Sequence, residues 1–507
     1  MAQENVSTQP SKRRRIDEEL EPREVLVQVD TAETKQEVYA ASPKCYVSTL
    51  VLKMEECLGK LCVKDVDMAE LERMSIMIYE SMSISSRDYH SVQHVFDISK
   101  DMTQSIPILS ALFHDCVYFQ VDKRLTTAQE ELLHGTYTSD DRGNLEFKAS
   151  AEDCNDELLK LVEFLFSYKA GQKIEKGLNE FLSALIGVRC LKKFLPMNQL
   201  AEVACCIEAT IPFRSDNPDT KLQPMEHLFS RLVEANKKFK LEMKDDEMEQ
   251  AIHYAVEVAL NDVGNFASTD VYDFLDGTWS LLPEQNENLR MQYCITAMDL
   301  QRALNGMYGF FNFFLKPENV FDDFRGLPTQ KELDWKLELC KRNVGIAKKY
   351  VGAKLYAMSV VAAFACLTGG DGPLSLFLGD LNSNKSMLHH TNFDDVLPEC
   401  PLDQLKRCDK VVYHILKEGR KTETQFDTKQ SPISAYLYAA LGDERLTEIL
   451  HTIKLLPMEK ENARLILKTL PIEALEALSG ALKGIALSRT KKFEKLFQEL
   501  RDEMSTS

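Results

Sequence analysis

The stretch Tyr89-His90-Ser91-Val92-Gln93-His94-Val95-Phe96-Asp97-Ile98 places a second histidine four residues, and an aspartate seven residues, after His90. Residues at these spacings return to one face of an α-helix, so His90, His94 and Asp97 are predicted to project together. The nearby dipeptide His114-Asp115 adds an imidazole and a carboxylate. These groups are the ligands that hold Zn, Fe, Mn or Mg in proteins. The sequence therefore predicts a metal site in this region.

The predicted fold is all-α. Apolar residues recur at helical spacing from Tyr46 onward, and sustained alternation of apolar and polar residues is scarce. The pattern predicts helices over these segments: Arg87 to Met102, Pro107 to the His-Asp pair, Asn286 to Phe314, Lys331 to Tyr350 and Lys354 to Leu367.

Composition limits the classes of function. The chain of 507 residues, with 44% hydrophobic side chains, is long enough for two or three domains with a real core. Its 61 basic and 79 acidic side chains give a net charge of −18, which argues against general nucleic-acid binding. A small anionic substrate is still allowed, because a bound metal ion reverses the local field.

The sequence predicts a cytoplasmic protein without a membrane segment. Its 13 cysteines form no C-x-x-C pair, which is typical of reduced, buried thiols. The N-terminus has no apolar signal core, and the apolar run from Leu355 to Leu367 is shorter than the roughly 18 residues that a membrane span needs.

We expect three regions. Residues 1–42 are poor in aromatic residues and are predicted to be a disordered tail. The basic run from Lys12 to Arg15 in this tail is either a nuclear-localisation signal or part of a solvated tail. Residues 43–325 contain the candidate site. Residues 326–507 are predicted to be a C-terminal helical domain that binds a protein partner or forms a homo-oligomer, and a polar segment in it, from His389 to Asp395, is a weaker metal-binding alternative.

The first two motifs resemble those of the HD superfamily of metal-dependent phosphohydrolases. The stretch from Tyr89 to Ile98 looks most like the Y-H-N-x-x-H-A-x-D-V signature of cyclic-nucleotide phosphodiesterases, with Ser91 in place of Asn and Val95 in place of Ala. His114-Asp115 resembles the second superfamily element. The last aspartate of the pattern is best matched by Asp262. The resemblance implies an HD-like helical bundle.

The resemblance also implies roles for these residues. The implied metal ligands, for one or two divalent ions (Zn, Mn, Fe or Mg), are His94, His114, Asp115 and Asp262. His90 is similar to the family's leaving-group acid. Asp97 is expected either to orient a histidine or to be an exposed helix carboxylate.

The sequence departs from the phosphodiesterase pattern in two ways. Tyr118 stands where those enzymes have a histidine, and no counterpart of the glutamine and phenylalanine that hold the nucleotide base is found. A simpler HD phosphohydrolase of unknown substrate therefore fits the sequence better.

Three functions are consistent with the sequence. The first is hydrolysis of a small phosphate ester or nucleotide by a metal-activated water. The second is a catalytically lapsed HD domain that acts as a binding or scaffold module. The third is a di-iron HD-type oxygenase, which would use extra histidines among His134, His227 and His253. On an ideal helix His253 lies nearly opposite Asp262, so we do not expect these two residues to share an ion.

Overall fold

The structure is a computed structural model that describes residues 45–139, 145–150, 155–169, 171–174, 176–217, 220–291, 294–378, 396–453 and 455–505. The described residues from Tyr46 onward belong to one compact unit. The predicted tail of residues 1–42 with its basic run, and the segment from His389 to Asp395, lie outside the described residues.

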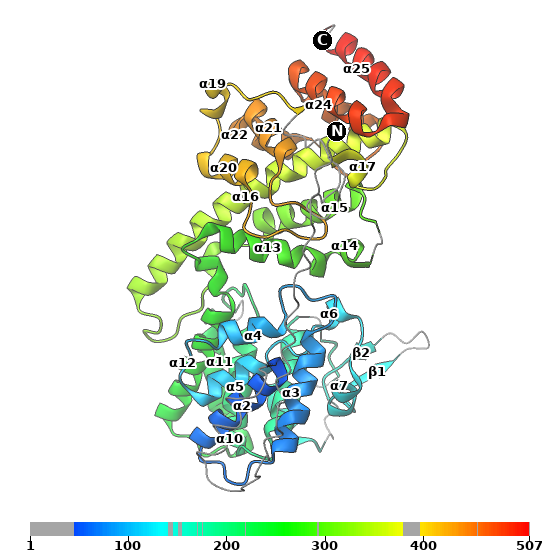
Figure 1. Cartoon of the computed structure of the whole chain (residues 1–507). Helices are drawn as coiled ribbons and strands as arrows, with labels where there is room; N and C mark the ends of the chain where they lie inside the picture. Colours follow the sequence, from blue (N-terminus) through cyan, green and yellow to red (C-terminus); the bar gives the residue numbers. More distant parts are fainter. Residues whose placement is uncertain are drawn as a thin grey trace, which may run out of the picture. The chain divides into compact units, whose positions relative to one another are not determined.

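The prediction of an all-α fold is confirmed, since the described residues form helices and one two-stranded sheet (Figure 1). The first helices are α2 (Tyr46–Lys60), α3 (Met68–Met82), α4 (Val92–Ile98), α5 (Ser105–Phe113), α6 (Phe119–Asp122) and α7 (Thr127–Leu132). The antiparallel strands are β1 (Tyr137–Ser139) and β2 (Leu145–Phe147). The helices that follow are α8 (Glu157–Leu165), α9 (Leu178–Leu191), α10 (Met197–Ala209), α11 (Pro224–Phe239) and α12 (Asp245–Asp262).

The second half of the chain is also helical. Around the site it forms η1 (Gly264–Ala267), α13 (Val271–Gln285), α14 (Glu287–Met291), α15 (Ala297–Gly309), η2 (Phe310–Phe314) and η3 (Pro317–Asn319). It continues with α16 (Gln330–Thr368), α17 (Ser375–Leu378), α19 (Leu402–Leu405), α20 (Lys410–Glu418), α21 (Pro432–Leu441) and α22 (Asp443–Thr452). It ends with α23 (Lys460–Lys468), α24 (Ile472–Ile485), η5 (Leu487–Arg489) and α25 (Thr490–Ser505).

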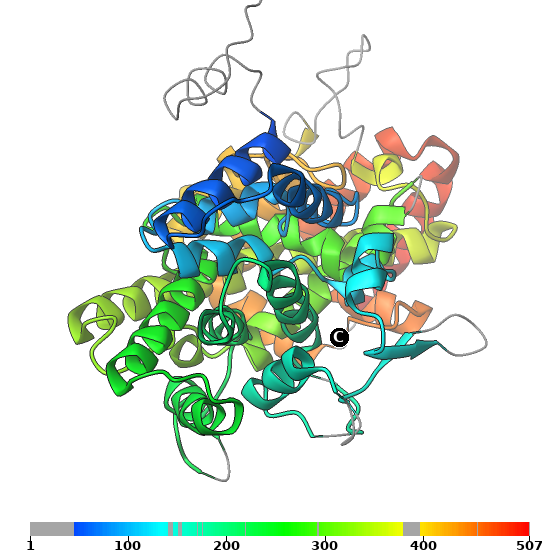
Figure 2. The same ribbon diagram turned by 90° about the horizontal axis from the view of Figure 1, so that it is seen from below.

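Helix α10 is the centre of the part of the fold that carries the motifs. It is apolar on most of its circumference, and its residues from Val203 to Ala209 are all buried. A helix that is apolar all round must be covered on every side. Helices α5, α8, α9, α11 and α12 all pack against it, while α2 lies beside α3 and contacts α5 (Figure 2). This packing places the ends of α5 and α12 next to each other.

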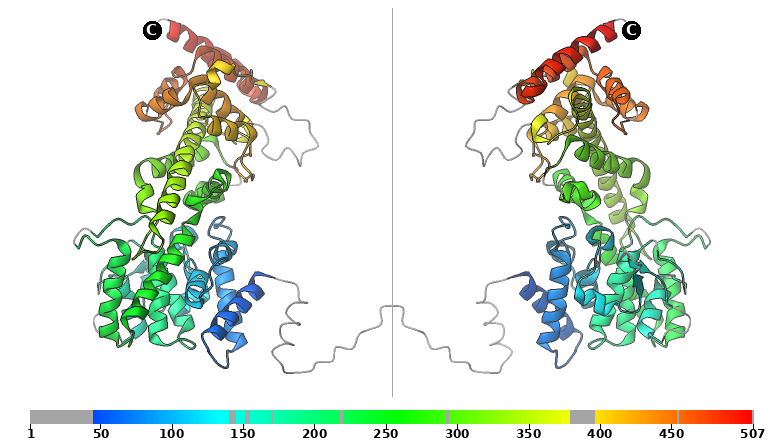
Figure 3. Two further views of the ribbon diagram at one scale, coloured as in Figure 1. Left: turned by 90° about the vertical axis from the view of Figure 1, so that its left-hand side faces the viewer. Right: turned by 90° about the vertical axis from the view of Figure 1, so that its right-hand side faces the viewer.

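Helix α16 is a single helix of 39 residues, so the prediction of two helices with a break before Lys354 is wrong. Gly352 stays helical and is required by packing, since a Cβ atom there would lie 2.9 Å from Leu450 Cδ1 and 3.2 Å from Tyr308 Cε2. Part of α16 is long and apolar enough to cross a membrane, but 89% of that window is buried inside the structure. Helix α16 contacts α13 and α15, and also α20 to α23 and α25 (Figure 3).

Two further predicted helices are shorter in the structure. The helix expected from Arg87 to Met102 is reduced to α4, because the backbone N–H groups of Tyr89 and His90 donate to the side chain of Glu284 instead. The segment expected to be one helix from Asn286 to Phe314 contains α14, α15 and η2. A capping box of Thr296 with Asp299 begins α15 as a new helix.

The compact unit spans the boundary expected after residue 325, and α16 packs against both α15 and η1. Separate domains on the two sides of this boundary stay a prediction.

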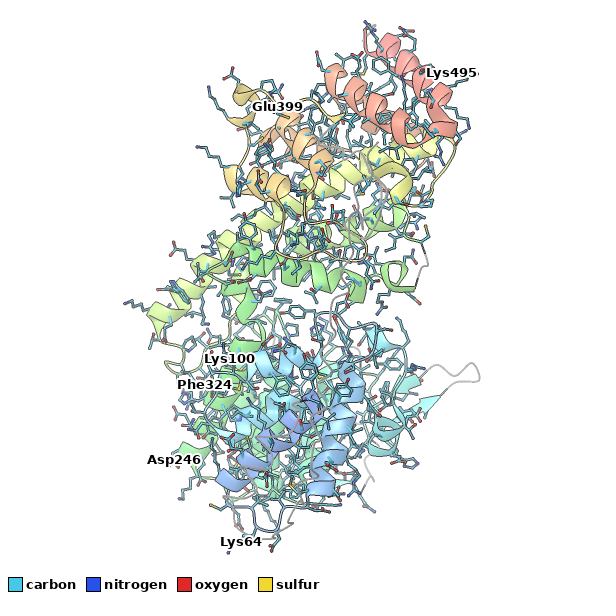
Figure 4. The ribbon with its side chains drawn as sticks, in the orientation of Figure 1. Lys64, Lys100, Asp246, Phe324, Glu399 and Lys495 are labelled. Carbon is cyan, nitrogen blue, oxygen red and sulfur yellow. The ribbon has the colours of Figure 1, made fainter. Side chains whose placement is uncertain are left out.

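The charged residues labelled in Figure 4, such as Lys64, Asp246 and Lys495, are exposed, whereas Phe324 is buried.

Candidate metal centre

Three helices bring the candidate ligands together. His94 lies in α4, His114 follows the last residue of α5, and Asp262 is the last residue of α12. Helices α4, α5 and α12 contact one another in pairs. The backbone of Asp115 is fixed by Arg87, whose Nη1 donates to its carbonyl oxygen over 2.6 Å while Nη2 pairs with the Asp122 carboxylate.

The four residues form one compact group. One ligand atom from each of His94, His114, Asp115 and Asp262 can be chosen so that all four lie within 4.8 Å of one another. Asp262 Oδ1 lies 3.2 Å from His94 Nε2 and 3.5 Å from His114 Nε2. Asp115 Oδ2 lies 3.0 Å from His114 Nε2 and 3.7 Å from His94 Nε2. The group could therefore hold a metal ion.

The proton on His114 can be placed from its neighbours. His114 Nδ1 lies 2.8 Å from the carbonyl oxygen of Ala111, which can only accept, so Nδ1 carries the proton. His114 Nε2 is buried and has no hydrogen-bond partner among the described residues. This nitrogen faces the carboxylates of Asp115, at 3.0 Å, and Asp262, at 3.5 Å. Two imidazoles and two carboxylates fit the ligand preference of a divalent ion such as Zn, Fe or Mn.

The charges of the group stabilise one another. Burial raises the pKa of Asp262, but the adjacent imidazoles of His114 and His94 more than offset it and hold that pKa at about 2. Burial likewise opposes ionisation of Asp115, and the neighbouring His114 and His90 lower its pKa well below the usual range. Both carboxylates are thus ionised at neutral pH and available to a cation.

His90 lies beside this group but outside helix α4. Its Nε2 is 4.0 Å from Asp115 Oδ2, and its Nδ1 is 2.5 Å from Glu284 Oε2. Burial lowers the pKa of His90, whereas the carboxylates of Asp115 and Glu284 raise it, with a net rise above the usual value. His90 is therefore held with one ring nitrogen on the Glu284 carboxylate and the other facing Asp115, one of the candidate ligands.

Two acidic residues at the site were missed by the sequence analysis. Glu284, in α13, has a fully buried side chain, and it accepts hydrogen bonds from the backbone N–H groups of Tyr89 (2.7 Å) and His90 (3.0 Å). Glu180, in the first turn of α9, has its pKa raised to about 7 by burial and by the charges of Asp115 and Asp262. Neither residue belongs to a local motif, and the contact of Glu284 with His90 spans 194 residues of sequence.

Asp97 is not brought to the site. Its side chain is exposed on α4, where it accepts a hydrogen bond from Gln93 Nε2 over 2.8 Å. Its predicted projection beside His90 and His94 is therefore not found. Tyr118 does lie at the site, with its ring edge-on to His90 at a centroid distance of 4.8 Å.

The histidines proposed for a di-iron site lie elsewhere. His134 is exposed, and His227 Nε2 lies 3.4 Å from Asn217 Nδ2. The ring of His253 packs against Phe324 at 5.6 Å. Among the residues that the structure describes, none of the three belongs to the group that could hold a metal ion.

Comparisons with protein-family models, with curated proteins and with solved structures find no match for this chain.

Proposed function

We propose that the protein is a metal-dependent hydrolase that cleaves a small phosphate ester or nucleotide with a metal-activated water. The observation that carries the proposal is the pairing of a four-ligand group, His94, His114, Asp115 and Asp262, with a histidine 4.0 Å from one of those ligands. The resemblance of these residues to the HD superfamily motifs supports the same reaction.

The chain's own residues have two tasks in this reaction. A divalent ion held by the four ligands would lower the pKa of a coordinated water and polarise the phosphate. That water, having lost a proton to solvent, would attack phosphorus as hydroxide while the bond from phosphorus to the leaving oxygen breaks. His90 donates the proton on Nε2 to that leaving oxygen, because Glu284 holds Nδ1 and stabilises the protonated ring.

A carboxyl group beside the candidate ligands could bind a phosphate oxygen of the substrate if the carboxyl group is protonated. Glu180 adds a carboxyl group near Asp115 and Asp262, and burial together with their charges raises its pKa to about 7. A raised pKa favours the neutral acid, which can donate a hydrogen bond to a phosphate oxygen.

The first experiment is elemental analysis of the purified protein beside the His114→Ala variant. We expect about one or two equivalents of divalent metal in the parent and loss of this metal in the variant, since His114 is a fully buried ligand. If the parent binds none of Mn, Fe, Zn or Mg after incubation, hydrolysis is refuted in favour of a scaffold module.

The second experiment tests whether His90 acts as a general acid and not as a metal ligand. His90→Ala should keep its metal and lose about 10²- to 10⁴-fold in turnover of a phosphate ester, which is the usual contribution of a general acid. Asp97→Asn is the matched control, because Asp97 lies in the same motif but is exposed. Turnover by His90→Ala at the parent rate would remove His90 from the mechanism.

A further inference from the structure

A second buried polar group lies around Trp279, away from the metal ligands. We define the Trp279 cluster as Trp279 of α13, Lys354 of α16, and Arg420 and Asp427 of the loop between α20 and α21. Asp427 Oδ2 accepts hydrogen bonds from Trp279 Nε1 (2.8 Å), from Lys354 Nζ and from Arg420 Nη2 (3.2 Å). One carboxylate thus joins three separate segments of the chain.

The charged side chains of the cluster are buried. The side chains of Arg420, Lys354 and Asp427 are 0%, 4% and 7% exposed. The guanidinium of Arg420 lies over the Trp279 ring at 4.6 Å, with its Nη1 3.6 Å from Asp276 Oδ1 on the same helix. Charged groups at this depth tolerate little displacement, because losing a partner leaves a charge unpaired away from water. The cluster therefore fixes α13 against the C-terminal region.

The same helix ends at the candidate site. Glu284 follows Trp279 by five residues, a rise of about 7.5 Å along a helix. Its carboxylate accepts from the backbone N–H groups of Tyr89 and His90 and contacts His90 Nδ1. The side chains of Leu282, Pro283 and Glu284 are all buried, so the end of α13 is packed as tightly as its middle. A shift of α13 at Trp279 is thus transmitted to His90.

We propose that the Trp279 cluster positions Glu284, and through it His90, so that the C-terminal helical region controls the proton-donating step. This inference rests on the proposed function, since it assigns to Trp279 and Asp427 a positioning role in that reaction. Arg420 and Asp427 are the residues of the C-terminal region that would carry the control.

The test compares Trp279→Phe with the parent on two diesters that differ in their need for a proton, bis(p-nitrophenyl) phosphate and diphenyl phosphate. Phenolate leaves less readily than p-nitrophenolate, so misplacing His90 should slow diphenyl phosphate more. We expect a loss of at least about tenfold for diphenyl phosphate, under about threefold for bis(p-nitrophenyl) phosphate, and an unchanged metal content. His90→Ala should likewise slow diphenyl phosphate more than bis(p-nitrophenyl) phosphate, with the full loss of about 10²- to 10⁴-fold on diphenyl phosphate.

The matched control is Lys421→Ala. Lys421 also contacts α13, at Asp270 and Asp273 over 2.6 Å, but through exposed side chains. It should leave both rates unchanged. Equal losses on the two diesters in Trp279→Phe, or no loss, would reduce the cluster to a structural role and overturn the inference while the proposed function stands. A parent that binds no metal and cleaves neither diester would overturn both.

A second measurement does not depend on a destabilising variant. The chain has two tryptophans, and the other one, Trp335, is 50% exposed. In the Trp335→Phe protein Trp279 is the sole tryptophan. Because Trp279 shares α13 with Glu284, which contacts His90 beside the candidate ligands, adding Zn and then inorganic phosphate should change the Trp279 emission. Unchanged emission at saturation, with binding confirmed by elemental analysis, would overturn the inference.

Discussion

At the scale of single residues, Glu284 is the most constrained side chain at the candidate site, because one buried carboxylate serves two backbone donors and the His90 ring. Glu284→Gln keeps the shape but removes the charge that favours protonated His90. We expect the metal content to be retained and hydrolysis to fall about 10- to 100-fold, as for other residues that orient a site histidine. The exposed Glu287→Gln is the control, and a full rate in Glu284→Gln would show that His90 needs no charged partner.

Asp322 tests the pH dependence of stability. Burial, only partly offset by Arg214, raises the pKa of Asp322 from 3.8 to about 6. The folded protein therefore keeps this proton at pH values where the unfolded chain has lost it, so stability falls as the pH rises from about 4 to about 6.

Replacing Asp322 should remove this loss of stability with rising pH. Asp322→Asn is expected to match the parent near pH 4 and to be more stable at pH 8, by up to about 3 kcal/mol in the free energy of unfolding. Urea unfolding at both pH values measures the difference. A variant that is less stable than the parent at pH 8 would show that the ionised pair with Arg214 is favourable.

The candidate-site residues differ in whether the sequence alone could predict them. His94, His114 and Asp115 could be predicted because each belongs to a short motif whose spacing carries the chemistry. Asp97 belongs to the same motif but is exposed, and His90, with which it was expected to share a helix face, lies outside α4. Glu284 could not be predicted, because its contact with His90 is set by packing across 194 residues.

At the scale of elements, the glycines of α16 give a matched pair. A Cβ at Gly352 would meet Leu450 and Tyr308, whereas a Cβ at Gly345 would meet nothing within 4 Å. Gly345→Ala should stabilise the protein by about 0.5–1 kcal/mol through helix propensity. Gly352→Ala should destabilise it by about 1–3 kcal/mol through overpacking. Thermal unfolding distinguishes the two, and equal effects would mean that α22 can move away from α16.

Gly352 lies at the break that was wrongly predicted before Lys354 in α16. A glycine inside an apolar helical pattern indicates either a break or a close approach of two helices, and the sequence alone does not distinguish them. Existence of helices is predicted well because apolar periodicity reports burial directly. Their ends are predicted less well, because caps such as Thr296 with Asp299, and contacts such as Glu284 with residues 89 and 90, decide where each helix starts.

At the scale of the whole molecule, the boundary after residue 325 can be tested by truncation. A protein of residues 46–325 lacks α16, which covers η1, α13 and α15. We expect it to bind a hydrophobic dye and to lose cooperative thermal unfolding, because Trp279 and its neighbours would be exposed. Cooperative unfolding with full metal binding would instead establish the boundary as a true domain limit.

The wide separation of the candidate ligands has a consequence for synthesis in the cell. His94 and Asp262, 3.2 Å apart in the folded protein, are separated by 168 residues. At typical elongation rates a ribosome adds that length in about 8 to 34 s. During this interval the nascent chain carries unpaired imidazoles and His114-Asp115 without their last partner. If the proposed function holds, metal loading by all four candidate ligands would follow translation of α12, and the rate of elongation would set its earliest time.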